Sequence, residues 1–155
     1  MAASLAGDHA PRLVPIANRL VRRLAALGVP LGPNVLLTVR GRTSGLPHTF
    51  PVALMKTDGR LFIQSPYGQV QWVKNLRADG RATLTRSSKA EEVDAVEVTP
   101  EQAGPILRAA IAPYLRNRLG AAVSRVFVPL PPDASADDYV EHVRSHPMFE
   151  LRPRA

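Results

Sequence analysis

Short apolar segments separated by strong turn signals restrict the fold of this chain more than any other feature. Residues 34–40 alternate between apolar and polar side chains, which is typical of a half-buried β-strand. Asp58 and Gly59 form a strong two-residue hairpin signal. On this basis we expect strands at residues 34–40, 49–56, 60–64, 81–86, 92–98 and 148–151. The fourth and fifth have apolar or small residues on both faces in places, which favours a small closed barrel over an open sheet.

Prolines and helix-capping signals divide the remaining chain. Pro51 lies inside the second expected strand, so that strand should be at an edge or bulged there. Residues 99–102 combine an N-cap threonine, a proline in the first turn and a glutamine at the capping-box position, which predicts a helix start. Pro113 should break or kink this helix. Apolar periodicity predicts further helices at residues 70–78 and 114–126, and a last short helix from Ser135.

The N-terminal segment predicts an amphipathic helix after a loose leader at residues 1–10. In residues 11–28 apolar side chains recur every three or four positions, with arginines mostly on the opposite face. Such a helix could pack on the domain or lie on an anionic membrane surface, and both interpretations stay open. A chain of 155 residues is expected to form a single domain, 1–155.

Composition excludes several kinds of chemistry. The chain has no cysteine, which rules out disulfides, thiolate nucleophiles and cysteine-based metal sites. His142 and His146 lack an acidic third ligand in the same motif, so no metal site is expected. No run approaches the roughly 18 apolar residues that span a bilayer, and a secretory signal is not recognisable. We therefore expect a cytoplasmic protein, with membrane association left open.

The chain is strongly basic, with a formal net charge of +7 and a pI near 10.8. This charge indicates an anionic partner, such as a nucleic acid, a membrane surface or a phosphorylated small molecule. Aromatic residues make up only 5% of the chain, and no helix combines basic residues with rings that could stack on bases. Nucleic acid is therefore not the expected partner.

Two turn-rich segments, residues 40–51 and 65–76, each follow a strand-like run. If those strands pair, both segments can meet at one end of the sheet. Gly41 and Gly45 can adopt backbone angles closed to other residues, so that N–H groups converge on an anion. Arginines within residues 40–42 would add charge and forked donors. These residues predict a basic phosphate-binding pocket, with an ordinary turn as the alternative interpretation.

An ordered set of short motifs extends this pattern over roughly residues 34–98. The set consists of Gly41-Arg42-Thr43-Ser44-Gly45, Pro51, Asp58-Gly59, Ser65 with Gly68, and Trp72-Val73-Lys74-Asn75-Leu76, followed by a closing segment at 146–151. In this order the motifs resemble the deazaflavin-dependent nitroreductase family, which uses reduced coenzyme F420 and includes quinone reductases of actinobacteria. The resemblance implies an α+β fold with a mainly β core, a split β-barrel of about six strands with flanking helices.

The resemblance also implies which residues hold the coenzyme. Its phosphate would lie on Arg42, Thr43 and Ser44. The segment along the deazaflavin ring would comprise His48, Thr49, Pro51, Val52 and Ala53. The second turn would cover ring and tail with Ser65, Pro66 and Tyr67, and Trp72 and Asn75 would complete the pocket. Trp72 is expected to fill the core as well as to form a pocket wall, and Asn75 could instead cap its helix.

The chain departs from the family members at three positions of this pocket. Thr43, His48 and Pro66 stand where those members commonly carry Lys or Arg, Arg, and Lys, respectively. Fewer fixed cations weaken the expectation of tight binding of the coenzyme's polyglutamate tail. If His48 binds phosphate when protonated, affinity would fall between about pH 6 and 8, where an ordinary histidine loses its proton.

A deazaflavin carries its own hydride, so no catalytic side chain is assigned. The implied reaction is hydride transfer from the reduced coenzyme to a small-molecule electron acceptor such as a quinone, enone or nitro compound. Candidate hydrogen-bond donors to that acceptor are Ser65, Tyr67 and Tyr114, although Ser65 could serve only its turn and Tyr114 only its helix. The alternatives are a non-catalytic deazaflavin, FMN or haem carrier, or a basic protein on nucleic acid or membrane. A homodimer is also considered.

Overall fold

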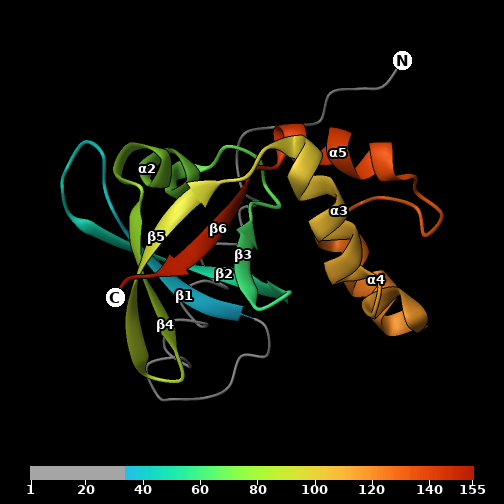
Figure 1. The fold of residues 1–155 in the computed structure, drawn as a ribbon, viewed down its shortest axis with the longest axis horizontal. Coiled ribbons are helices and arrows are strands. Elements are labelled where there is room, and N and C mark those ends of the chain that lie inside the picture. Colours follow the sequence, from blue (N-terminus) through green and yellow to red (C-terminus); the bar gives the residue numbers. More distant parts are fainter. Residues whose placement is uncertain (1–33) are drawn as a thin grey trace.

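A computed structural model describes residues 34–155, so the predicted leader at 1–10 and helix at 11–28 lie outside the described residues. The described part is built on a closed antiparallel barrel (Figure 1). Its strands are β1 (Asn34–Arg40), β2 (Pro47–Thr57), β3 (Arg60–Gln64), β4 (Arg81–Arg86), β5 (Lys89–Glu97) and β6 (Met148–Pro153). Their order around the barrel is β1-β2-β3-β6-β5-β4. The C-terminal strand therefore inserts between β3 and β5 and closes the barrel.

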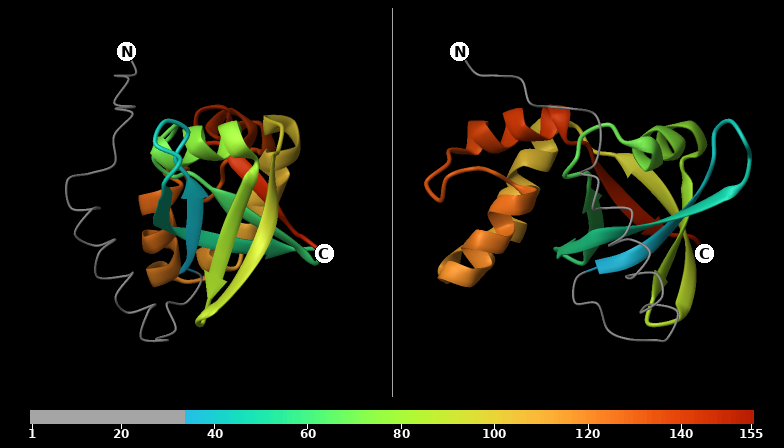
Figure 2. Two further views of the ribbon diagram at one scale, coloured as in Figure 1. Left: turned by 90° about the vertical axis from the view of Figure 1, so that its left-hand side faces the viewer. Right: turned by 180° about the vertical axis from the view of Figure 1, so that it is seen from behind.

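The helices lie on two sides of this barrel. They are α2 (Gln71–Asp79), α3 (Pro100–Ile111), the 3-10 helix η1 (Tyr114–Arg116), α4 (Arg118–Phe127) and α5 (Ala136–Ser145). Helix α2 lies near the turn between β1 and β2, whereas α3, α4 and α5 gather on the opposite side (Figures 1 and 2). Within residues 34–155, no helix is both long enough and apolar enough to cross a membrane.

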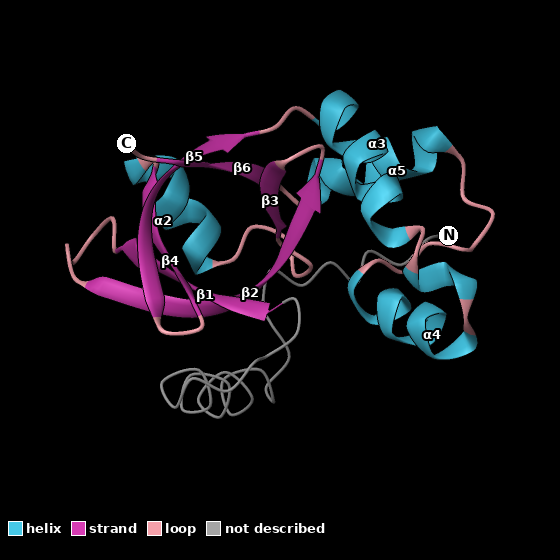
Figure 3. Cartoon of the chain, turned by 60° about the horizontal axis from the view of Figure 1, so that its bottom comes forward, coloured by secondary structure: helices cyan, strands magenta, loops and turns pink. Residues whose placement is uncertain are grey.

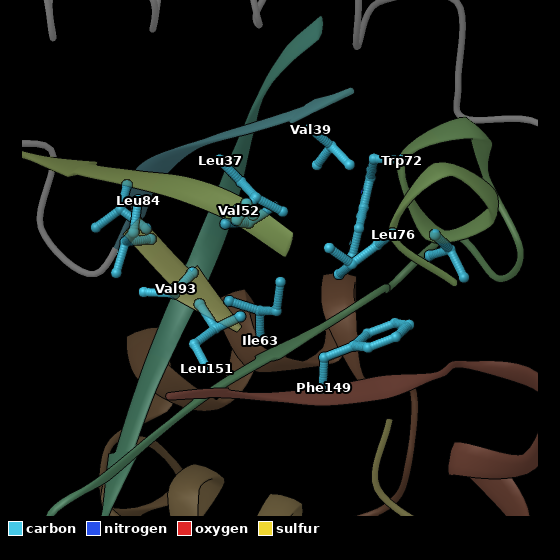
Figure 4. Packing of buried hydrophobic residues seen from close by; sticks show 13 residues of the cluster. Leu37, Val39, Val52, Ile63, Trp72, Leu76, Leu84, Val93, Phe149 and Leu151 are labelled. Carbon is cyan, nitrogen blue, oxygen red and sulfur yellow. The ribbon is translucent and has the colours of Figure 1, made fainter. Parts of the chain in front are cut away.

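Strand alternation produces two separate cores. Ile63 and Phe149 point into the barrel, where they pack with apolar residues of α2 (Figure 4). Their neighbours Phe62 and Met148 point outward and belong to a second cluster with α3 and α5. The two ends of the molecule are thus held by different apolar contacts, one inside the barrel and one between barrel and helices.

Most strand predictions are confirmed. The strands at 34–40, 60–64 and 81–86 have the expected bounds, whereas β5 begins at residue 89 instead of 92. Asp58 and Gly59 have φ values of 51° and 73°, as a type I′ hairpin turn requires. Pro51 pairs with β1, but pairing of β2 with β3 begins only at Leu54, so one side of the proline has no partner strand. The expected local edge at Pro51 is therefore present within a closed barrel.

The helix predictions need two corrections. Thr99 is the N-cap of α3, but its side chain makes no capping hydrogen bond, so the predicted capping box at 99–102 is wrong. A capping box occurs instead at α5, where Ser135 Oγ accepts from the Asp138 N–H (3.2 Å) and Asp138 Oδ2 accepts from the Ser135 N–H (2.8 Å). The chain after Pro113 is also not one helix, because η1 and α4 are separate elements.

An ion pair with two hydrogen bonds joins β6 to β3. Arg60 donates from Nε and Nη2 to the two carboxylate oxygens of Glu150, at 3.0 and 2.7 Å, and Arg152 adds a bond of 3.1 Å. The Glu150 side chain is only 10% exposed. The bonds from Arg60, followed by that from Arg152, lower the pKa of Glu150 from its ordinary 4.5 to about 2.

Glu150→Gln should lower the free energy of unfolding at pH 7 by about 2 kcal/mol, because hydrogen bonds to a charged group are lost. The pKa of Glu150 is lower in the folded than in the unfolded chain, so this stabilisation is complete above about pH 4.5 and disappears as the pH falls toward 2. Urea denaturation at pH 7 and pH 2.5 measures the difference. An equal loss at both pH values would contradict the assignment.

Candidate functional site

The turn between β1 and β2, residues 41–46, is closed by its own hydrogen bonds. The Gly41 N–H donates to the Leu46 carbonyl (2.8 Å) and the Gly45 N–H to the Gly41 carbonyl (2.9 Å). The Leu46 N–H donates to Ser44 Oγ (3.2 Å). Gly45 has a φ of 71°, in the region that favours glycine. These hydrogen bonds and the conformation of Gly45 therefore fix the structure of the β1–β2 turn.

The hydrogen bonds within the turn reduce the number of N–H groups that could converge on an anion. The Arg42 N–H is also engaged, because it donates to Asn75 Oδ1 at 3.3 Å. Within residues 34–155, the N–H groups of Thr43 and Ser44 make no hydrogen bond. Both residues are exposed. Two adjacent backbone donors, with a hydroxyl on each residue, thus remain available at the tip of the turn.

Helix α2 holds the basic side chain of this turn. Arg42 Nη1 donates to Asn75 Oδ1 (2.8 Å) and to Gln71 Oε1 (3.0 Å). Asn75 is 5% exposed, and it is fixed by the apolar residues of α2 that enter the barrel core. The helix is ended instead by Gly80, in the left-handed conformation, whose N–H donates to the Leu76 carbonyl. Asn75 therefore positions the β1–β2 turn and is not the C-cap.

An open hollow of about 410 Å³ adjoins the turn. It is lined by residues 40–45 and by Ala78 and Asp79 from the end of α2. His48 lies against the same turn, with its Nε2 3.5 Å from Ser44 Oγ. A Cβ on Gly41 would lie 2.7 Å from Ser44 Oγ and 2.9 Å from His48 Nε2, so a larger residue there would displace these two side chains. Arginines 40 and 42 and the free donors suit an anion, with Asp79 the one opposing charge in the lining.

The residues of β2 that were predicted to lie along the ring alternate between the barrel core and the outer face of the strand. Val52 is 6% exposed and its side chain belongs to the barrel core, so only its backbone remains for the predicted contact with a cofactor. Alternation places Thr49, Pro51 and Ala53 on the outer face. There Thr49 Oγ1 lies 2.9 Å from Thr38 Oγ1 on the neighbouring strand. Within this segment, a ligand can therefore reach the side chains of these outer three residues and of the exposed His48.

The segment at residues 65–70 leads into α2 and lies at the same end of the barrel as the β1–β2 turn (Figures 1 and 2). Ser65 is fully buried, and its hydroxyl donates to the Gly68 carbonyl at 2.5 Å. Since a hydroxyl has one proton, this bond favours the alternative that Ser65 serves its turn over the predicted donor role. Pro66 and Tyr67 are half-buried, so they remain accessible beside α2.

Two other predicted residues lie elsewhere. Trp72 is 6% exposed and points into the barrel core, with its ring centroid 6.1 Å from that of Phe149 (Figure 4). It fills the core, and its contact with a cofactor stays a prediction. Tyr114 lies on η1, which packs against α4 on the side of the molecule away from the β1–β2 turn (Figure 1). It is not brought together with the other candidates.

Gln71 and Asp79 were not among the predicted site residues. Gln71 is four residues before Asn75 on α2, which puts both amides on one helical face. That spacing could have identified Gln71 as a second partner only once Asn75 was known to contact Arg42. For Asp79 the sequence offers only its place in a helix-ending Asp-Gly pair, which predicts a turn and no contact with the hollow.

Comparison with solved structures defines the class of fold, and 44 chains match. The chain is similar to the protein Atu2129, of unknown function, from Agrobacterium tumefaciens (16% identity, TM-score 0.54, 95% of this chain and 58% of that one). It is also similar to a candidate 5-nitroimidazole antibiotic resistance protein from Bacteroides thetaiotaomicron (9% identity, TM-score 0.51, 86% and 80%). The chain thus spans 58% of the length of the Agrobacterium protein. Identities this low establish the fold alone, which is an α+β split barrel.

A family model identifies the chain more closely. The model of F420H(2)-dependent quinone reductases matches residues 15–117, more than half of the chain. This range contains the β1–β2 turn, the segment at 65–70 and α2. The chain belongs to the F420H(2)-dependent quinone reductase family, and the resemblance drawn from its motifs is confirmed. Among curated proteins, none matches the sequence significantly.

Proposed function

We propose that this chain is a reductase that binds coenzyme F420 through its phosphate at the β1–β2 turn and reduces an electron-poor acceptor such as a quinone, enone or nitro compound. One observation carries the proposal. Arg42 is held by the buried Asn75 beside the N–H groups of Thr43 and Ser44, which make no hydrogen bond within the described residues. These are the donors that a phosphate takes, and they are arranged before any ligand arrives.

The residues around the turn fit the remaining demands of such a coenzyme. Reduced deazaflavin supplies the hydride when bound, so the chain has only to bind, orient and exclude water. The outer face of β2, with Thr49, Pro51 and Ala53, directly follows the turn and would lie along the ring. Tyr67, half-buried in the second turn, is the proposed hydrogen-bond donor to the acceptor.

Turnover tests the proposal. The purified full-length chain is mixed with reduced F420 and menadione without oxygen, and the reappearance of oxidised coenzyme is followed by absorbance. We expect a rate that is proportional to protein concentration and saturates with both substrates. Cyclohexenone and a nitroimidazole serve as the enone and nitro acceptors. A chain that accelerates none of the three reactions is not a reductase of this class.

A second candidate is a non-catalytic carrier of a deazaflavin, FMN or haem. The observation that favours it is that two of the three residues predicted as hydrogen-bond donors to the acceptor have other contacts or lie elsewhere. The Ser65 hydroxyl is committed to Gly68, and Tyr114 lies on the other side of the molecule. Saturable binding of one of these cofactors without any turnover would support the carrier and contradict the reductase.

Asn75→Ala should weaken F420 binding about tenfold, because Arg42 loses its buried partner and the ligand must order the turn. The free energy of unfolding should fall by about 1–3 kcal/mol, since the Arg42 N–H loses its acceptor. Gln71→Ala is the matched control, because this exposed amide accepts one bond from the same arginine. Its effects should stay within about threefold and 0.5 kcal/mol. Fluorescence titration and urea denaturation measure both; equal losses in the two variants would rule out a positioning role for Asn75.

A further inference from the structure

Apolar side chains are exposed together on η1 and α4. Leu119, Val123 and Phe127 are 77%, 51% and 41% exposed, and Tyr114 on η1 is 50% exposed. Of the six large hydrophobic residues exposed within residues 34–155, four lie on these two elements. The three on α4 are spaced four residues apart and therefore form one row along the helix. We call these three residues the apolar row.

The fold holds the apolar row outward. Asn117 caps α4 by accepting the Gly120 N–H at 2.7 Å. Gly120 lies so close to the Tyr114 carbonyl that a Cβ would collide with it, which fixes η1 against the start of α4. Leu115 and Val128, on either side of α4, anchor the unit in the core beneath α3 and α5. Helix α4 therefore stands at the end of the molecule opposite α2 (Figures 1 and 3).

Exposed cations lie on the same two elements as the apolar row. Arg116, Arg118 and Arg125 are all exposed, and residues 114–127 contain no acidic side chain. None of the three arginines forms an ion pair within residues 34–155. At about 100° per residue, Arg118 and Arg125 fall close together on α4, about 100° or more around the helix from the apolar row, as on the polar face of an amphipathic helix. The surface thus combines an apolar centre with positive charge that has no local counter-ion.

We propose that η1 and α4 form a docking surface for an anionic lipid bilayer. The helix would lie in the interface with the apolar row in the acyl boundary, Tyr114 at the headgroup level and the arginines on lipid phosphates. Nucleic acid would engage the arginines but not the apolar row. A second copy would bring the arginines of both copies together across a two-fold interface, which like charges oppose. An anionic bilayer can contact both the apolar row and the arginines, which neither of these two alternatives does favourably.

Vesicle sedimentation with the full-length chain tests the charge. We expect binding to phosphatidylcholine vesicles that contain about one third phosphatidylglycerol, weakened by salt, and at least about tenfold weaker binding to phosphatidylcholine alone. The triple variant R116Q/R118Q/R125Q should bind the anionic vesicles at least about tenfold less well. The control variant K56Q/R81Q/K89Q removes the same charge from exposed barrel positions and should change binding by less than about threefold. Equal losses in the two variants would overturn the proposal.

The apolar row is tested separately. The double variant V123S/F127S should lower binding to the anionic vesicles at least about fivefold, whereas Val96→Ser, at another exposed apolar position, should not. A marked fall in melting temperature for V123S/F127S would mean that another part of the chain covers the row. A change from dimer to monomer in sedimentation would mean that a second copy covers it. Either result, or unchanged vesicle binding, would overturn the proposal.

Discussion

Replacing Trp72 by alanine should lower the free energy of unfolding by about 3–5 kcal/mol, the usual cost of removing a large aromatic side chain from a core. Trp72 is 6% exposed and lies between Val39, Leu76 and Phe149 inside the barrel (Figure 4). It is also the residue through which α2 reaches Phe149, at 6.1 Å between ring centroids. Its loss would leave a cavity between helix and barrel that a closed sheet can fill only in part.

Urea denaturation measures this loss, and Tyr114→Ala is the matched control. Tyr114 is 50% exposed, so its truncation should cost less than about 1 kcal/mol. The folded fraction of Trp72→Ala should bind F420 within about threefold of the parent chain. A stable variant with a large loss of affinity would instead place Trp72 in the pocket wall, as the sequence had suggested.

Replacing Arg42 by alanine should weaken F420 binding on the order of 100-fold. A charge-assisted bond to phosphate contributes about 1.5–3 kcal/mol, which corresponds to roughly 10-fold to 100-fold in affinity. The substitution also removes the guanidinium that joins the β1–β2 turn to Gln71 and Asn75, so the upper end of that range applies. Arg42→Lys keeps the charge but loses the fork, and should retain about a tenth of the affinity.

Arg81→Ala is the matched control for Arg42. Arg81 is exposed at the start of β4 and does not line the hollow. Its loss removes one positive charge from the molecule without touching the turn, so F420 affinity should change by less than about twofold at physiological salt. Similar losses for Arg42→Ala and Arg81→Ala would mean that net charge, and not the turn, attracts the coenzyme.

Local turn chemistry made most of the barrel predictable. Asp58 and Gly59 admit few structures other than a tight hairpin, and the glycine at 80, which ends α2 in the left-handed conformation, is a common helix-ending residue. The path of β6 could not be predicted, because pairing with β3 and β5 depends on contacts such as Arg60 with Glu150, 90 residues apart. Nor could the sequence distinguish a threonine that begins a helix from one that caps it with its side chain.

The meeting of the two turns was predictable from the sequence, whereas the contacts of several candidate residues were not. The basic turn and the segment at 65–70 do lie at one end of the barrel, as strand pairing implied (Figure 1). Val52 and Trp72 were assigned to a pocket, but both side chains are buried in the barrel core. For Val52 this could have been predicted, because strand alternation puts it on the same face of β2 as Phe50 and Leu54. The role of Asn75 depends on a tertiary contact with Arg42, for which the sequence has no local signal.

Equilibrium titration of the full-length chain with F420, FMN and haem, followed by fluorescence or absorbance, tests the central claim most directly. The account predicts saturable F420 binding at micromolar concentration or below, binding of FMN and haem at least about tenfold weaker, and loss of the F420 signal in Arg42→Ala. A chain that ignores F420 at micromolar concentration, or binds it equally well without Arg42, would contradict the account.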